Sequence, residues 1–246
     1  VKALKAYGQE KVGIVYCGGQ GGDQGTRALV NNLYGGTFTD PEHKEYTIDS
    51  AENIRALEFL RELDGISFEP DMVGENEISM FAGGELAMAF CWNVSMEISQ
   101  TAMNPERAFD IFPMSFPTDD GTPNLQGGIW GFGAFDNGDE ERLEAAKTFI
   151  RYMTGNEAQY VKSVQTALYW PVCEMDDIYV NDDIMREYSI FTKYLGDYYQ
   201  VTPGWAQART AWWHMLQDVG KGEPVDAAVK TFVETADGAA KAALEK

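Results

Sequence analysis

The stretch Phe81-Ala-Gly-Gly-Glu-Leu-Ala-Met-Ala-Phe-Cys-Trp92 contains, in succession, the end of a helix, a turn and an apolar run. A helical pattern over 78–81 reaches the two glycines, where the chain turns. The apolar run Leu86–Phe90 follows, and short apolar runs bounded by turn residues are typical of strands buried in a sheet. Trp92 comes directly after this run. The stretch therefore predicts a buried strand that ends at an aromatic ring.

Segments on both sides of this stretch alternate between strand and helix patterns. Lys11–Tyr16 is short, β-branched and apolar, which predicts a strand, and a glycine-rich loop leads from it to a helix over 26–33. Asp49, with Glu52 three residues on, has the pattern of a capping box, and apolar residues at helical spacing continue to Leu63. Residues 66–76 look irregular. Further strands are predicted over 108–112 and 131–135, and further helices over 98–103, 140–153, 156–165, 206–219 and 225–244. This alternation predicts an α/β fold.

Composition and charge exclude several classes of function. The chain has 246 residues and a net charge of -20, with 39 acidic against 19 basic residues, so binding to nucleic acid or to an anionic lipid surface is disfavoured. No apolar stretch is long enough to span a membrane, and the residues after Val1 lack the apolar core of a secretion signal. Three widely spaced cysteines and two histidines predict no disulfide framework, no zinc site and no histidine-based triad.

Motifs for cofactors and catalysis fail on spacing. Gly19, Gly21 and Gly25 are one residue too far apart for the dinucleotide pattern GxGxxG, and no Gly-Lys-Ser/Thr follows them. Carboxylate neighbours such as Glu75 and Glu77 stand in no recognisable catalytic context. The acidic runs also miss the pattern of oxygen ligands that binds calcium. We therefore expect no cofactor, no metal ion and no catalytic residue.

Aromatic residues are the informative class in this chain. Trp92, Trp130, Trp170 and Trp205 stand in turns or at the ends of predicted elements. A pyranose presents a patch of C–H bonds that packs on an aromatic face, and its hydroxyls need polar partners. Ligands of α/β sheets bind at the carboxyl ends of the strands. The alternative is that each ring fills its own core, and the helical position of Trp212 and Trp213 favours this for them.

The opening stretch resembles a motif of the extracellular solute-binding proteins of the maltose-binding type, family 1, in which F-x-x-G-x-x-A-M is followed shortly by Trp. Other segments are similar to that family in order and spacing, so the resemblance spans nearly the whole chain. These segments are Asn31-Asn32, Gly35–Phe38, Tyr46–Ser50, Phe112-Pro113, Gly127-Gly128, Ala145–Phe149, Trp170-Pro171 and Gly222–Ala228.

The resemblance implies an α/β, periplasmic-binding-protein-like (type II) fold of two lobes that close on a ligand by a hinge. This chain would contain mainly the second lobe, built from residues 1–108 and 155–246, and a returning segment of the first lobe, 109–154. The family's N-terminal part, which forms most of the first lobe, has no counterpart here. The apolar side chains of 109–154 would then lack their partner sheet. We expect this segment to repack, to pair with another chain or to belong to a longer protein.

The resemblance also implies a ligand site. Trp92 would line the cleft, and Trp130 and Trp205 occupy positions where such proteins often present stacking rings. The loop that contains Gln20 and Asp23 is similar in place to one that supplies polar contacts. Arg209 lies one helical turn beyond Trp205 and would donate a bidentate bond to ring hydroxyls or to a uronate carboxylate. Gly128, just before Trp130, is the remaining expected ligand-binding residue.

The function implied is capture of a carbohydrate, a mono- or oligosaccharide, for an ABC importer, without catalysis. The partners would be the solute and the transmembrane subunits of a permease. The protein would be periplasmic, or a lipoprotein at the extracellular face whose lipid anchor is the only link to the membrane. One alternative is a binding protein for a polyamine, a peptide or another small solute, because surplus carboxylates and tryptophan faces suit a cation. A less favoured alternative is a glycoside hydrolase.

Overall fold

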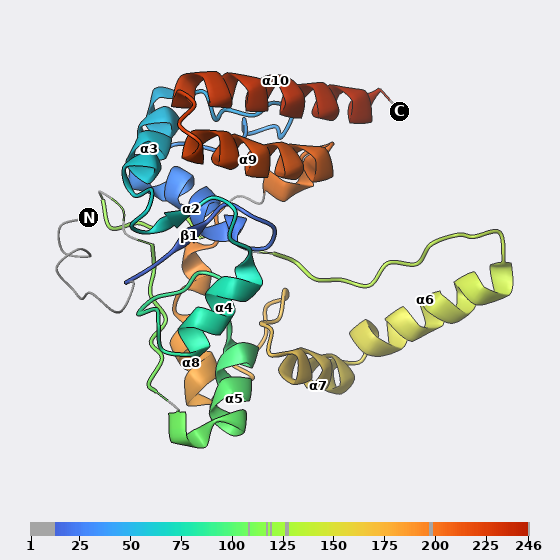
Figure 1. The fold of residues 1–246 in the computed structure, drawn as a ribbon. Coiled ribbons are helices and arrows are strands. Elements are labelled where there is room, and N and C mark those ends of the chain that lie inside the picture. The colour runs from blue at the N-terminus through green and yellow to red at the C-terminus, as the bar shows by residue number, and fades with distance from the viewer. Residues whose placement is uncertain are drawn as a thin grey trace. The chain divides into compact units, whose positions relative to one another are not determined.

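A computed structural model describes residues 13–107, 109–116, 118, 120–125, 128–196 and 199–245. The chain divides into two compact units (Figure 1). The first comprises Val1–Asn93, Met114–Gln126 and Tyr194–Lys246, and the second comprises Val94–Pro113 and Gly127–Lys193. The predicted segments 1–108, 109–154 and 155–246 have other boundaries, and their assignment to two lobes stays a prediction.

A parallel pair of short strands lies at the centre of the first unit. Strand β1 (Tyr16–Cys17) pairs in parallel with β2 (Phe68–Glu69). The chain passes between them through helices α2 (Asp23–Leu33) and α3 (Ala51–Glu62), as a parallel pairing requires a crossover connection. Helix α4 (Gly74–Ala82) follows β2. The alternation of strand and helix that the sequence predicts is therefore present in this unit.

The C-terminal helices complete the first unit. A 3-10 helix, η3 (Tyr199–Val201), precedes α9 (Trp205–Gly220) and α10 (Val225–Leu244), which lie side by side (Figure 1). Gly204 adopts a φ of 74° at the start of α9, and a Cβ there would lie 2.6 Å from the backbone of Ala239, so glycine is required. The core of the unit collects apolar side chains from all of these helices, among them Leu29, Phe38, Leu57, Phe68, Trp212, Leu216 and Phe232.

The second unit contains helices and irregular segments, and no strand among its described residues. Its elements are α5 (Val94–Met103), η1 (Pro105–Arg107), α6 (Glu140–Gly155), α7 (Glu157–Ala167) and α8 (Asp183–Ser189), and η2 (Thr192–Tyr194) lies where the two units meet in sequence. Helix α6 contains no buried residue. A small cluster of buried residues forms elsewhere in the unit, from Val94, Tyr179 and Met185.

The predicted helices are confirmed, and α2, α4, α5 and α9 begin one to four residues earlier than the sequence indicates. The start of α3 corrects one detail. The sequence predicts Asp49 as the cap, but the helix is capped by Ser50, whose side chain accepts the backbone N–H of Asn53 at 3.3 Å. Asp49 itself is exposed. Both residues have side chains suited to capping, so the sequence could not choose between neighbouring positions.

Replacing Ser50 by alanine is expected to destabilise the protein by about 1 kcal/mol, because an N-terminal N–H of α3 loses its acceptor. Urea unfolding followed by circular dichroism measures the change. Asp49→Ala is the matched control and should cause no comparable loss. A larger effect of Asp49→Ala than of Ser50→Ala would contradict the observed cap.

Three of the predicted strands are wrong. Residues 86–90, 109–112 and 131–135 form no strand, while Ala108 lies outside the described residues. Leu86 is a single bridge position, and the N–H groups of Ala87 and Met88 both donate to the carbonyl of Gly13, at 3.2 and 2.9 Å. The predicted strand Lys11–Tyr16 appears only at its end, as β1, and Lys11 and Val12 are not described. Strand β2 lies in the segment 66–76 that looked irregular.

Apolar side chains of the segment 109–154 are unusually exposed. Phe135 is 87% exposed and Ile129 is 79% exposed. These side chains have the composition of a buried strand but find no sheet among the described residues, which is why the predicted strand 131–135 does not form. Other apolar side chains of this segment are also exposed, namely those of Phe112, Met114, Trp130, Phe132, Phe149 and Tyr152.

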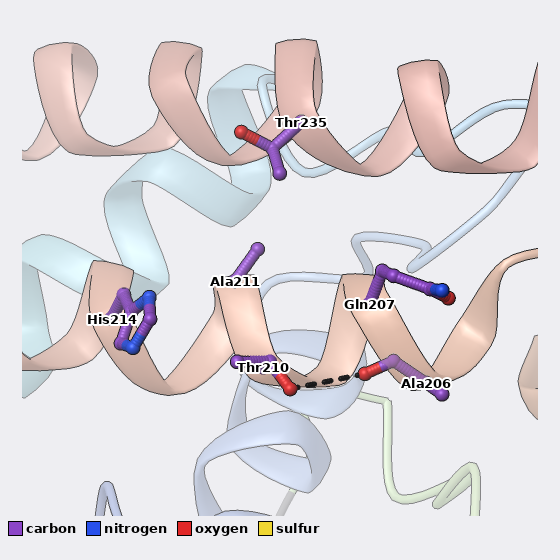
Figure 2. Close-up of a pocket in the computed structure, with 6 residues that line it drawn as sticks. All are labelled: Ala206, Gln207, Thr210, Ala211, His214 and Thr235. Carbon is purple, nitrogen blue, oxygen red and sulfur yellow. Dashed lines mark hydrogen bonds between the residues drawn. The ribbon is translucent and has the colours of Figure 1, made fainter.

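An open pocket of about 420 Å³ lies against α9 and α10 (Figure 2). Its lining contains one titratable side chain, an imidazole, and no tryptophan, tyrosine or phenylalanine ring. None of the residues predicted to bind ligand belongs to it. The lining residues are Ala206, Gln207, Thr210, Ala211, His214 and Thr235.

Candidate functional site

The loop after β1 lies against the start of α4. Gln20 is exposed on this loop, and its carbonyl accepts the backbone N–H of Gly74 at 3.1 Å. A Cβ on Gly74 would lie 2.7 Å from the backbone of Gly21, so the two segments approach as closely as glycine allows. The loop ends at Asp23, in the first turn of α2, where a carboxylate is favoured by the helix dipole. The carboxyl end of β1 therefore leads directly to a charged residue.

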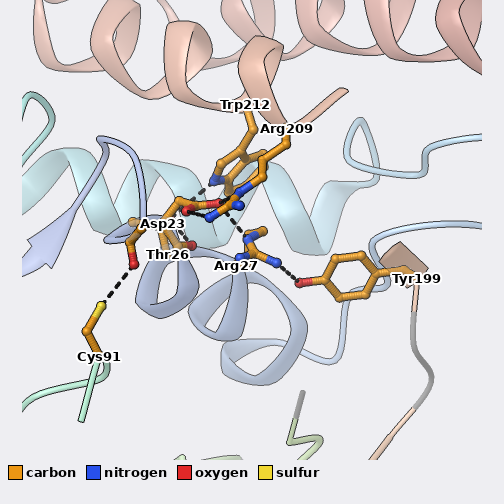
Figure 3. Close-up of polar contacts among 8 residues, drawn as sticks. Asp23, Thr26, Arg27, Cys91, Tyr199, Arg209 and Trp212 are labelled. Carbon is orange, nitrogen blue, oxygen red and sulfur yellow. Dashed lines mark hydrogen bonds and ion pairs between the residues drawn. The ribbon is translucent and has the colours of Figure 1, made fainter. Parts of the chain in front are cut away.

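Asp23 is fully buried and contacts two guanidinium groups (Figure 3). The Nη2 and Nε atoms of Arg209 in α9 donate to its two carboxylate oxygens at 2.8 and 3.2 Å. The Nε atom of Arg27, one helical turn further along α2, lies 2.9 Å from the same carboxylate. Arg27 also donates to the hydroxyl of Tyr199 at 2.9 Å. This network ties the start of α2 to the start of α9.

The electrostatics of Asp23 follow from these contacts. Burial by itself would raise the pKa of the carboxyl group, but the hydrogen bond from Arg209 and the charges of Arg27 and Arg209 outweigh it. The pKa of Asp23 is therefore held below its ordinary value of 3.8. Asp23 is ionised at neutral pH and keeps the guanidinium group of Arg209 in a fixed orientation.

Aromatic rings surround the two guanidinium groups. The guanidinium carbon of Arg27 lies 5.4 Å from the ring centre of Trp205, and that of Arg209 lies 5.2 Å from the ring centre of Trp213. Trp205, Arg209 and Trp213 follow one another at intervals of four residues, so they lie along one side of α9. All three are half-buried. The side chain of Arg209 is 32% exposed, so its guanidinium is fixed and still reaches solvent.

The segment Phe90–Trp92 contacts both α4 and the loop after β1. The backbone N–H of Phe90 donates to the buried carboxyl of Glu77 in α4 at 2.5 Å. The thiol of Cys91 donates to the carbonyl of Gly21 at 3.0 Å, in the loop after β1 (Figure 3). The ring of Trp92 lies edge-on to Phe81, with ring centres 4.8 Å apart. The segment is thus attached both to α4 and to the glycine loop.

The structure brings five of the seven predicted ligand-binding residues into the first unit. Gln20, Asp23 and Arg209 belong to the loop, to α2 and to α9 as described above. The ring of Trp205 packs edge-on to that of Tyr199, with ring centres 5.5 Å apart. Trp205 is partly buried against the core of the unit. Trp92 is half-buried, and its indole N–H is shielded from solvent without a hydrogen-bond partner among the described residues.

Trp130 and Gly128 belong to the second unit. Trp130 is 76% exposed, and its ring stacks on Tyr169 with an interplanar angle of 7° and ring centres 6.1 Å apart. Gly128 is exposed, and Gly127 lies outside the described residues. The expectation that Trp130 and Gly128 bind ligand stays a prediction.

Sequence reasoning missed three residues of this region. Arg27 follows Asp23 at helical spacing, so an acid–base pair could have been found from the sequence. Trp213 was expected in the core, and it is half-buried against the core while its ring also lies beside the guanidinium group of Arg209. Glu77 gave no signal, since one acid among 39 has no distinguishing pattern.

The remaining candidate chemistry is limited. The described residues contain no group of three or more His, Cys, Asp or Glu side chains placed to hold a metal ion. All three cysteines are free, and burial raises the pKa of the Cys17 thiol to about 12, with a further rise from the charges of Glu77 and Glu69. Over the described part of the chain, none of the helices has the length and apolar character that crossing a membrane requires.

A sequence profile of the bacterial extracellular solute-binding proteins matches residues 5–175. The chain belongs to this family. The resemblance that the stretch around Phe81–Trp92 indicates is confirmed. No curated protein matches the chain.

Solved structures confirm the fold. A solute-binding protein of an ABC transporter from Thermotoga lettingae, bound with α-D-tagatose, is 18% identical with a TM-score of 0.69 over 93% of this chain and 59% of its own length. A maltose/maltodextrin-binding domain from Bdellovibrio bacteriovorus, bound to maltotriose, is 15% identical with a TM-score of 0.67. It is covered over 62% of its length, and this chain over 95%.

A third structure is a solute-binding protein of an ABC transporter from Agrobacterium radiobacter in complex with ribitol. It is 19% identical with a TM-score of 0.66, over 96% of this chain and 61% of its own length. The α/β, periplasmic-binding-protein-like fold is therefore confirmed, and the solute-binding protein described here spans about three-fifths of the length of these structures.

Proposed function

We propose that this solute-binding protein captures a carbohydrate, a mono- or oligosaccharide, for an ABC importer. The observation that carries the proposal is the guanidinium group of Arg209, which Asp23 holds along one edge and which lies over the ring of Trp213. A sugar needs fixed planar donors for its hydroxyls and an aromatic surface for its C–H face. Two of the similar structures were solved with a sugar and a third with a sugar alcohol, which supports the same class of ligand.

Gln20, Asp23, Trp92, Trp205 and Arg209 are the proposed ligand-binding residues of the first unit. Arg209 and Gln20 would bind hydroxyls. Trp92, which is half-buried, would offer a ring face. Asp23 is buried and acts on the ligand through the orientation of Arg209. A ligand loses less binding energy to ordering when the groups that bind it are already fixed. An arginine held in place, as Arg209 is, should therefore bind a ligand more tightly than an exposed, mobile arginine would.

A polyamine is supported less well by the same geometry. An ammonium ligand needs carboxylates that are free to approach it. Of the two buried carboxyls in this region, Asp23 is already bound to Arg27 and Arg209. Burial raises the pKa of the other, Glu77, and the hydrogen bonds that it accepts from Cys91 and Phe90 offset this only in part. Neither group is suited to holding a second cation.

The remaining parts of the proposal follow from membership of the family. The protein would act without catalysis and would deliver its ligand to the transmembrane subunits of a permease. It would work outside the cytoplasm, in the periplasm or at the extracellular face as a lipoprotein. Trp130 and Gly128 are proposed as further ligand contacts, in the second unit.

Titration with ligands tests the proposal. Intrinsic tryptophan fluorescence and thermal stability are followed against monosaccharides, oligosaccharides, sugar alcohols, uronates and polyamines. A saturable change with one class of sugar is expected. Trp92→Ala should weaken it by about tenfold or more, since truncating a central aromatic contact typically costs more than about 1–2 kcal/mol of binding energy.

Phe135→Ala is the matched control, because Phe135 is an exposed aromatic residue of the other unit. Its affinity for the sugar should equal that of the wild type. Saturable binding of polyamines alone would replace the carbohydrate by a cationic solute. Release of a chromophore from an aryl glycoside would show instead that the protein is a hydrolase.

A further inference from the structure

Glu77 is a fully buried acid in the first unit, outside the ion network of Asp23. It lies in the first turn of α4, and its Oε1 atom accepts the backbone N–H of Phe90 at 2.5 Å. Its Oε2 atom is buried and has no hydrogen-bond partner among the described residues. A buried carboxyl group with one unsatisfied oxygen costs stability. Such a cost is typical of groups that serve a purpose other than stability.

The bonds of Glu77 converge on the segment that carries Trp92. The N–H of Phe90, which its carboxyl group accepts, lies two residues before Trp92. Phe81 lies four residues after Glu77, on the same side of α4, and contacts the ring of Trp92. Helix α4 therefore holds this segment at two points one turn apart, by its backbone through Glu77 and by the indole through Phe81.

The segment needs such an attachment because it has no regular structure. Residues 87–93 belong to no helix or strand, so no ladder of backbone hydrogen bonds determines where Trp92 lies. The Cys91 thiol adds one weak bond, to Gly21. Without the acceptor on Glu77, the N–H of Phe90 would be left unpaired while partly buried.

We propose that Glu77 is a positioning residue for ligand binding, which holds the segment Phe90–Trp92 on α4 and so fixes the ring of Trp92 toward the ligand. This inference rests on the proposed function of Trp92 as a ligand contact. Glu77 itself does not touch the ligand. Its contribution reaches the ligand through one hydrogen-bonded segment.

Two substitutions separate the acceptor from the charge. Glu77→Gln keeps an oxygen for the N–H of Phe90 and replaces only the unpartnered oxygen. Affinity for the sugar that the ligand titrations identify should therefore stay close to that of the wild type. Glu77→Leu keeps the size of the side chain and removes the acceptor. It should weaken binding by about tenfold.

A double-mutant cycle distinguishes positioning from general destabilisation. If Glu77 acts through Trp92, then Glu77→Leu should cause no further loss of affinity in a Trp92→Ala background. Glu75→Leu is the matched control, since Glu75 is exposed on the same turn of α4. Ile48→Val, in the core of the same unit, controls for lowered stability without a contact to Trp92. Both controls should leave affinity unchanged.

A ligand-free measurement keeps the inference separate from the proposed function. The contribution of Trp92 to fluorescence is obtained by subtracting the spectrum of Trp92→Phe, in the wild type and in each Glu77 variant. Glu77→Leu should increase the quenching of this contribution by acrylamide, and Glu77→Gln should not. In the wild type, the amide proton of Phe90 should exchange slowly with solvent, which can be measured even if Glu77→Leu does not fold.

The outcomes are distinct. Slow exchange at Phe90, increased quenching in Glu77→Leu and a non-additive cycle together support the inference. Unchanged quenching, fast exchange at Phe90 or additive losses of affinity would overturn it and leave Glu77 a structural residue. If no ligand of the panel binds but quenching responds as expected, the positioning of Trp92 is supported and the carbohydrate proposal alone fails.

Discussion

Asp23→Ala is expected to destabilise the first unit by about 3–5 kcal/mol, because it leaves two guanidinium groups next to a buried cavity without their carboxylate. Arg27 is 1% exposed and cannot turn to solvent without disrupting the core. The same substitution frees the side chain of Arg209, so affinity for the ligand should fall together with stability. Urea unfolding and ligand titration at neutral pH measure the two losses.

The stability that Asp23 contributes depends on pH in a defined direction. Since the pKa of this carboxyl group is lower in the folded than in the unfolded protein, its contribution is complete above the ordinary value of 3.8 and is lost as the pH falls through the folded value. The difference in unfolding free energy between the wild type and Asp23→Ala should therefore shrink below that pH.

Asp183→Ala is the control for this prediction. Asp183 also pairs with an arginine, Arg186 at 3.7 Å, but the acid side chain is 95% exposed, so the pair should contribute little. If Asp23→Ala lost less than about 1 kcal/mol, the network would not be the desolvated ion pair that its burial indicates.

Trp212→Ala is expected to cost about 3–5 kcal/mol of unfolding free energy, because it creates a large cavity in the core of the first unit. Trp212 is fully buried, and its ring centre lies 5.0 Å from that of Phe38 and 5.6 Å from that of Phe232. Its indole N–H also donates to the hydroxyl of Thr26 at 3.2 Å. Chemical denaturation followed by circular dichroism gives the loss.

Two further variants make this test specific. Trp212→Phe fills most of the space but loses the bond to Thr26, so its loss of stability should lie between those of the wild type and Trp212→Ala. Trp130→Ala removes the same side chain at a position that is 76% exposed and should change stability far less. Equal losses for Trp130→Ala and Trp212→Ala would contradict the observed burial.

The helices and the family could be predicted from the sequence because their signals are local. The spacing of Leu57 and Leu60 in α3 and the order of residues from Phe81 to Trp92 need no knowledge of distant contacts. The pairing of Asp23 with Arg209 is different, since 186 positions separate them and each residue type is common in the chain. The family resemblance assigned both residues to the expected ligand site but did not pair them with each other.

Strands were predicted poorly because a strand exists only with a partner. The predicted strand Gly131–Phe135 has exposed apolar side chains, because no neighbouring strand meets it among the described residues. Phe68–Glu69 looked irregular and is paired, because the crossover through α2 and α3 brings it beside β1. Composition reports what a segment can bury, while pairing depends on what the rest of the chain places next to it.

The sequence by itself therefore determined the helices and the family. The tertiary structure alone decided which buried acid has a lowered pKa and which has a raised one. Asp23 and Glu77 are both fully buried, but two guanidinium groups outweigh the effect of burial at Asp23 and lower its pKa, whereas Glu77 has no cation to do so and burial raises its pKa. The charge of a buried carboxyl group is set by its neighbours in space, which no local pattern encodes.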